Sequence, residues 1–122
     1  MAQTSSAVFT RSAGYDAPID LVRLAANTMG NRDLEVQVLR LFATQSHSAL
    51  EQLDACDDLQ SAKVIVHTLK GSARAVGADK IAAVCEALEK ELETGNPKRV
   101  QQLARSVGEA NSYIDDLLSP AS

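Results

Sequence analysis

His67 is the residue of this sequence best suited to chemistry, because cations recur at helical spacing around it. Lys63, Lys70 and Arg74 stand at positions i−4, i+3 and i+7, and at about 100° per residue all three fall within about 60° of the histidine. Apolar residues of the same segment fall on the opposite side, so we expect His67 to point to solvent. Surrounding cations favour the neutral, nucleophilic imidazole and would attract an incoming phosphoryl group.

Gly71 follows His67 by one helical turn, where glycine costs a helix about 0.5–1 kcal/mol relative to alanine. Two explanations are open. The missing side chain leaves room beside the imidazole for a phosphoryl group and for the backbone of a partner protein, or it permits a close helix crossing. The helical wheel does not decide between them.

A metal site is not expected in this chain. His47 and His67 fall on different predicted helices, no Glu-x-x-His motif is present, and His67 points outward, whereas a metal centre in a helical bundle needs inward-facing ligands. Cys56 and Cys85 lack the spacing of a zinc site. We interpret them as reduced thiols, with Cys85 acting as a small buried hydrophobic residue.

Composition indicates the kind of fold that holds these residues. A chain of 122 residues that is 45 % hydrophobic and 3 % aromatic fits one compact all-α domain. The net charge of −4, with no basic stripe, argues against nucleic acid and anionic membranes as partners. No stretch is typical of a signal peptide or a membrane span, so a cytoplasmic protein is expected. Residues 1–16 are predicted to form a flexible tail and residues 17–122 the domain.

Turn signals divide the domain into five helical segments, expected at about 18–29, 33–55, 59–76, 79–94 and from 96 onward. Asn96 and Pro97 are the predicted N-cap and first residue of the last helix. The expected core stripe of the second helix is Leu34, Val38, Leu41, Phe42, Ala49 and Leu53. Four long amphipathic helices bury such stripes by packing together. The prediction is an antiparallel up-down-up-down four-helix bundle, monomeric, with a short extra N-terminal helix at one end.

The sequence HTLKGSA at residues 67–73, followed by VGA at 76–78, resembles the H-x-L-K-G-S-[SA]…G-[AL] signature of histidine-containing phosphotransfer (HPt) domains. The resemblance extends over about residues 19–117. It implies a phosphorelay carrier without ATP chemistry of its own. His67 would accept a phosphoryl group from a receiver-domain aspartate or a kinase and pass it to the receiver aspartate of a response regulator.

The resemblance also implies roles for the neighbours of His67. Family precedent points to Glu89 on the next helix as an acceptor for Nδ1–H, which would leave Nε2 as the phosphorylated atom. Lys70 is expected to neutralise charge on the phosphoryl group during transfer. Gln45 matches an amide near the histidine in eukaryotic members. The alternative for Glu89, Lys70 and Gln45 is an ordinary polar residue in contact with solvent.

The expected partners are a sensor or hybrid histidine kinase and response-regulator receiver domains. No cofactor is expected, and Mg²⁺ would be bound by the receiver domain. Docking needs an exposed patch near the histidine. The candidates for partner contacts are Leu21, Leu24, Val38, Leu41, Val64, Thr68 and Arg74. Core packing is the alternative for the apolar candidates, and the alternative function is a docking module of the same fold that is never phosphorylated.

Overall fold

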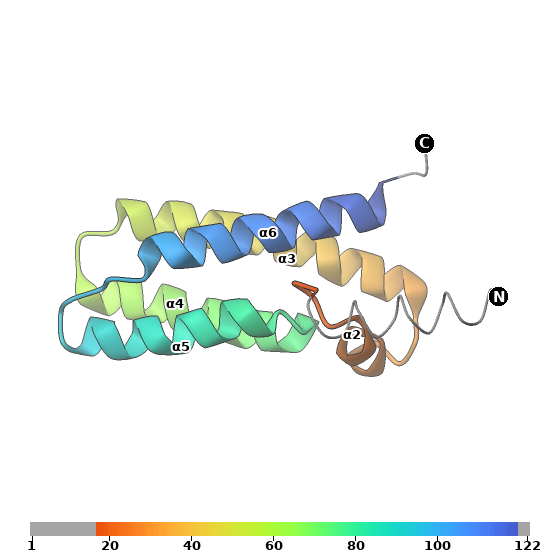
Figure 1. The fold of residues 1–122 in the computed structure, drawn as a ribbon, viewed down its shortest axis with the longest axis horizontal. Coiled ribbons are helices and arrows are strands. Elements are labelled where there is room, and N and C mark those ends of the chain that lie inside the picture. Colours follow the sequence, from red (N-terminus) through yellow and green to blue (C-terminus); the bar gives the residue numbers. More distant parts are fainter. Residues whose placement is uncertain (1–16, 120–122) are drawn as a thin grey trace.

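The computed structural model describes residues 17–119, and this range contains five helices and no strand. The helices are α2 (Leu21–Asn27), α3 (Arg32–Ala55), α4 (Leu59–Val76), α5 (Asp79–Glu93) and α6 (Val100–Leu118). Figure 1 shows α3 to α6 as long helices lying side by side, with α2 near the end where α4 gives way to α5. The predicted tail, residues 1–16, lies outside the described residues.

The bundle is closed because each long helix packs against two others. Contacts join α3 to α4, α4 to α5, α5 to α6, and α6 back to α3. Each helix contributes fully buried side chains to one core, among them Phe42, Val66, Leu88 and Leu103. The predicted all-α bundle with a short N-terminal helix is therefore confirmed. None of the helices in the described range is long and apolar enough to span a membrane.

The core face of α3 differs from the predicted stripe. Leu34 and Leu41 are 41 % and 60 % exposed, so their assignment to the core is wrong. The side chains of α3 that are buried are those of Leu39, Phe42, Ser46 and Ala49. Two apolar rows run along this helix at spacings of three and four, and periodicity alone does not say which row faces inward.

The start of α6 also differs from the prediction. Asn96 and Pro97 are not helical, and α6 begins at Val100. The carboxylate of Glu91 explains the delay, because its Oε1 accepts hydrogen bonds from the backbone N–H groups of residues 98 and 99 at 2.7 and 3.1 Å. These N–H groups are satisfied from the preceding helix, so they need no N-cap at Asn96.

The first helix is shorter than expected at both ends. The prediction was a helix over about 18–29, whereas α2 covers Leu21–Asn27. The Asp20 side chain caps the first turn. Met29 and Gly30 take positive φ angles of 54° and 73°, and this left-handed conformation ends the helix.

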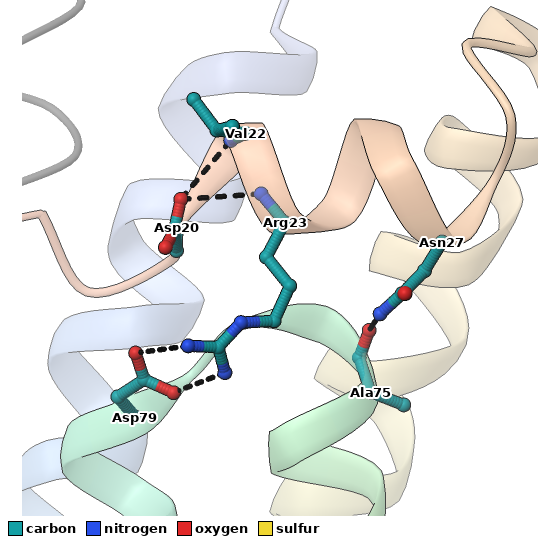
Figure 2. Close-up of polar contacts among 6 residues, drawn as sticks. All are labelled: Asp20, Val22, Arg23, Asn27, Ala75 and Asp79. Carbon is teal, nitrogen blue, oxygen red and sulfur yellow. Dashed lines mark hydrogen bonds and ion pairs between the residues drawn. The ribbon is translucent and has the colours of Figure 1, made fainter.

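Polar contacts attach α2 to the turn between α4 and α5 (Figure 2). Arg23 donates two hydrogen bonds to the Asp79 carboxylate, at 2.5 and 3.0 Å. The amide of Asn27 donates to the backbone oxygen of Ala75 at 2.8 Å, and so satisfies a carbonyl in the last turn of α4. Asp79 is the first residue of α5, so α2 holds the end of one helix and the start of the next.

Candidate functional site

His67 lies on the outer face of α4. Its side chain is 72 % exposed, while Val66 and Leu69 beside it in the sequence are buried in the core. This orientation follows from the apolar stripe of α4, which turns Ala62, Val66, Leu69, Ala73 and Val76 inward. The predicted exposure of His67 is confirmed.

Glu89 reaches His67 from the neighbouring helix α5. Its Oε2 lies 2.9 Å from Nδ1 of the imidazole, and its side chain is only 22 % exposed. An ionised carboxylate accepts hydrogen bonds and cannot donate them, so Nδ1 must carry the proton. In the neutral ring the free electron pair is then on Nε2, the nitrogen that makes no hydrogen bond to any described residue. The geometry thus matches the predicted position of Glu89.

Lys70 lies beside Glu89 rather than in open solvent. Its ammonium is paired with Oε1 of that carboxylate, and its side chain is 16 % exposed. Burial alone would raise the pKa of Glu89, but the hydrogen bonds from Lys70 and His67 outweigh it, so the pKa lies below its ordinary value of 4.5. Glu89 is therefore a carboxylate at neutral pH, with one oxygen on the lysine and the other on the histidine.

The other two cations near His67 differ from each other in their contacts. Arg74 is paired with Glu86 of α5 at 3.0 Å. Lys63 is half-buried and forms no ion pair with any of residues 17–119. The sequence indicated an imidazole ringed by like charges. That expectation is wrong for Lys70 and Arg74, because α5 supplies carboxylates that the wheel of α4 cannot show.

Gly71 stands at an open part of the surface. A Cβ atom added there would meet no atom within 4 Å, apart from the neighbouring backbone of its own helix. No other helix crosses close to this position, which removes the explanation by helix crossing. The explanation that remains is space on the exposed side of α4, one turn from the imidazole.

A shallow groove runs along the seam between α3 and α4, next to the histidine. Its volume is about 230 Å³, and its walls are mostly apolar. Gln45 lines it from α3, and Val64 and Thr68 line it from α4. Gln45 makes no hydrogen bond to His67. It is one of the residues that line this groove. Ser48 and Gln52 also line it, and sequence reasoning did not single them out.

The seven candidates for partner contacts fall into three groups. Leu24 is 2 % exposed and packs in the core, so the core-packing alternative applies to it. Leu21 and Val38 are partly buried against the core. Leu41, Val64, Thr68 and Arg74 are exposed, and of these Val64 and Thr68 stand within one turn of His67.

The thiol of Cys85 is not suited to reactivity, and no group of metal ligands is present among the described residues. Both cysteines are free, and Cys85 is fully buried. Burial, with a smaller contribution from the charge of Glu89, raises the pKa of the Cys85 thiol to about 12. A thiol that stays protonated packs as a small hydrophobic residue. No cluster of three or more metal-binding side chains occurs within residues 17–119.

Comparison with known proteins adds one finding. A family model described as "Hpt domain" matches residues 37–119. The match contains all of α4, α5 and α6 and most of α3, and therefore the whole site around His67; α2 lies outside it. No curated protein and no solved structure matches the chain.

Proposed function

Because the chain belongs to the Hpt domain family, whose role is phosphotransfer in two-component systems, we propose that His67 is its phosphoryl-accepting residue. The donor would be an aspartyl phosphate on a receiver domain or a phosphorylated sensor or hybrid histidine kinase. The acceptor would be the receiver aspartate of a response regulator. The observation that supports this role best is the hydrogen bond between Nδ1 of His67 and Glu89, because it directs Nε2 to solvent.

The proposed transfer begins with the neutral imidazole. The electron pair of Nε2 attacks phosphorus, a bond from nitrogen to phosphorus forms, and the bond from phosphorus to the donor's carboxylate oxygen or histidine nitrogen breaks. The proton on Nδ1 stays in place, so the ring becomes positively charged. The carboxylate of Glu89 stabilises that charge, as the aspartate behind a catalytic histidine does. The reverse sequence delivers the phosphoryl group to the next aspartate.

Lys70 serves this chemistry through Glu89 in our proposal. Its ammonium keeps the carboxylate ionised and holds one oxygen, so that the other stays directed at Nδ1. Lys70 is thus a positioning residue. The open surface at Gly71 gives the phosphoryl group and the partner's backbone access to the exposed face of the imidazole.

The groove between α3 and α4 provides the docking surface of the proposal. Val64, Gln45 and Thr68 line this groove, and the exposed Leu41 lies about one helical turn before Gln45 on α3. Together they offer a mixed surface of modest size, which suits a transient partner. We expect Mg²⁺ to be required by the receiver domain and not bound by this chain. We place the exchange in the cytoplasm, because both cysteines are free thiols, as in a reducing compartment.

The test is incubation of the protein with a receiver domain carrying labelled aspartyl phosphate. We expect label that is stable in alkali and labile in acid, and its loss in His67→Gln. His47→Gln is the matched control, because His47 is equally exposed and also lies beside a glutamate. Absence of label from the wild type would support the alternative, a docking module that is never phosphorylated. Equal labelling of His67→Gln would assign the phosphoryl group to another residue.

A further inference from the structure

Lys63 is the one cation around His67 whose ammonium is not held by a carboxylate of the described residues. Lys70 is paired with Glu89, and Arg74 with Glu86. Lys63 is half-buried, and a partly buried lysine ordinarily covers apolar surface with its stem and keeps its charged end in water. The ammonium is therefore available for an anion that is not part of the described chain.

The geometry of α4 puts Lys63 on the side where a phosphoryl group would lie. Side chains of a helix lean toward its N-terminus, so the imidazole of His67 covers the preceding turn, which Lys63 and Val64 occupy. Glu89 holds Nδ1, which leaves Nε2 as the nitrogen directed away from α5. Gly71, in the following turn, offers no side chain. A phosphoryl group on Nε2 would thus lie toward the turn that carries Lys63, whose ammonium has no ion pair among the described residues.

We propose that Lys63 contacts the phosphoryl group of phosphorylated His67 and stabilises its charge during transfer. This inference rests on the proposed function, and it separates the roles of two lysines. Lys70 acts at the Nδ1 side of the ring through Glu89, whereas Lys63 acts at the Nε2 side on the phosphoryl oxygens. A phosphoryl group bound to nitrogen keeps two ionisable oxygens, and an ammonium in contact with them favours the doubly charged form.

The first test uses phosphoramidate as a small phosphoryl donor, so that no partner protein is involved. Nε2 attacks its phosphorus, the bond from phosphorus to nitrogen breaks, and the protonated amine leaves as ammonia. We expect Lys63→Gln to be labelled about two- to fivefold more slowly, which corresponds to the strength of an exposed charge pair. Lys63→Arg should restore most of the rate. Lys90→Gln is the control, since Lys90 is an exposed lysine on α5, where it lines a hollow with Glu91 and Arg99.

The second test is a pH titration of the phosphorylated protein followed by ³¹P NMR. Lys63→Gln should raise the pKa of the phosphoryl group, because the cation that favours the doubly charged form is gone. Lys70→Gln should leave that pKa close to the wild-type value. If Lys63 served fold stability alone, Lys63→Gln would leave the phosphoryl pKa unchanged, and a cation at this position in Lys63→Arg would not be what restores the labelling rate.

Three results would overturn the assignment of Lys63. One is a wild-type labelling rate and an unchanged phosphoryl pKa in Lys63→Gln. Another is a phosphoryl pKa that changes in Lys70→Gln and not in Lys63→Gln, which would show that Lys70 contacts the phosphoryl group. The third is slower labelling with a phosphorylated receiver domain only, which would make Lys63 a contact for the partner protein. Labelling of His67→Gln at the wild-type rate would instead contradict the proposed function itself.

Discussion

Glu89 and Lys70 together determine which nitrogen of His67 is available. The carboxylate is held on both sides, by the lysine at Oε1 and by the imidazole at Oε2, so its position does not depend on solvent. The same contact that fixes the proton on Nδ1 also places a negative charge beside the ring, where positive charge develops during transfer. In the proposed transfer, a single side chain from α5 would thus orient the nucleophile and stabilise the product.

Replacing Glu89 by glutamine should slow phosphoryl transfer about tenfold, because a hydrogen bond to a charged group is worth about 1.5 kcal/mol. The amide keeps the size of the side chain and can still accept from Nδ1, but it no longer neutralises the ring. Glu93→Gln, one turn further along α5, is the matched control. Rapid-quench measurement of transfer from a phosphorylated receiver domain tests this, and equal rates for Glu89→Gln and wild type would remove Glu89 from the site.

Acid should weaken the bundle through the same carboxylate. The pKa of Glu89 in the folded protein lies below its ordinary value of 4.5. Its contribution to the free energy of unfolding is therefore complete above that value and is lost as the pH falls through the lowered pKa. Urea unfolding across this acidic range should show a smaller loss of stability in Glu89→Gln than in wild type. Identical pH dependence of the two proteins would contradict the lowered pKa.

Gly71→Ala should affect stability and function in opposite directions. The added methyl group meets nothing in the structure, so the helix should gain about 0.5–1 kcal/mol of stability. Transfer should slow, because the methyl group occupies the space that we assign to the phosphoryl group and the partner. Thermal unfolding and transfer kinetics measured on the same preparation check both signs. A more stable variant with unchanged transfer would show that the open surface has no role.

At the level of elements, α2 fixes the turn between α4 and α5. Arg23 and Asn27 contact the two helices on either side of that turn, and the N–H of Asp20 donates to the backbone oxygen of Gly77 at 2.8 Å. His67 and Glu89 lie on the two helices that the turn joins. The hydrogen bond between His67 and Glu89 depends on the register between α4 and α5. The contacts of α2 hold that same pair of helices.

Gly77→Ala should destabilise the protein more than Gly30→Ala. Both glycines have positive φ angles, 80° and 73°, and each alanine should cost about 1–2 kcal/mol for that conformation. At Gly77 the new Cβ would also lie 2.7 Å from the backbone oxygen of Asp20, whereas at Gly30 it would meet nothing. The difference between the unfolding free energies of the two variants measures the cost of the close contact between Asp20 and Gly77. Equal values would contradict a close contact there.

Helix boundaries were predictable where one local signal sets them. Both ends of α4 were predicted correctly, because the side chain of Asp58 caps its first turn and Gly77 ends it in a left-handed conformation. The start of α6 was not predictable in this way. The N–H groups of residues 98 and 99, just before α6, donate to Glu91 of another helix, and a contact of this kind depends on tertiary structure rather than on neighbouring residues.

Considered as a whole, the molecule separates its core from its exposed apolar side chains more sharply than the sequence indicated. The exposure of His67 was predictable, because the apolar stripe of α4 occupies the face of the helix opposite to His67. The pairing of Lys70 and Arg74 with glutamates was not, because it depends on how α4 and α5 are aligned. The packing of α2 and α3 was not predictable either, since Leu24 and Leu41 were both candidates for partner contacts, yet Leu24 is buried and Leu41 is exposed. Since the described helices close their own core, we expect a monomer.

Leu24→Ala and Leu41→Ala should therefore have contrasting effects. Loss of the buried Leu24 side chain should destabilise the bundle by about 2–4 kcal/mol. Loss of Leu41 should change stability by less than about 0.5 kcal/mol and should weaken binding of a receiver domain. Unfolding and binding titrations of both variants measure this contrast. Unchanged receiver binding by Leu41→Ala would exclude Leu41 from the proposed docking surface.

The most direct test of the account is to identify the nitrogen of His67 that carries phosphorus. Two-dimensional ¹H–¹⁵N NMR of the phosphorylated protein, with ³¹P coupling to the ring nitrogens, makes this assignment. The predicted result is phosphorus on Nε2, with Nδ1 still protonated and bonded to Glu89. Phosphorus on Nδ1, or on no histidine of the chain, would contradict the central claim that Glu89 orients His67 for transfer.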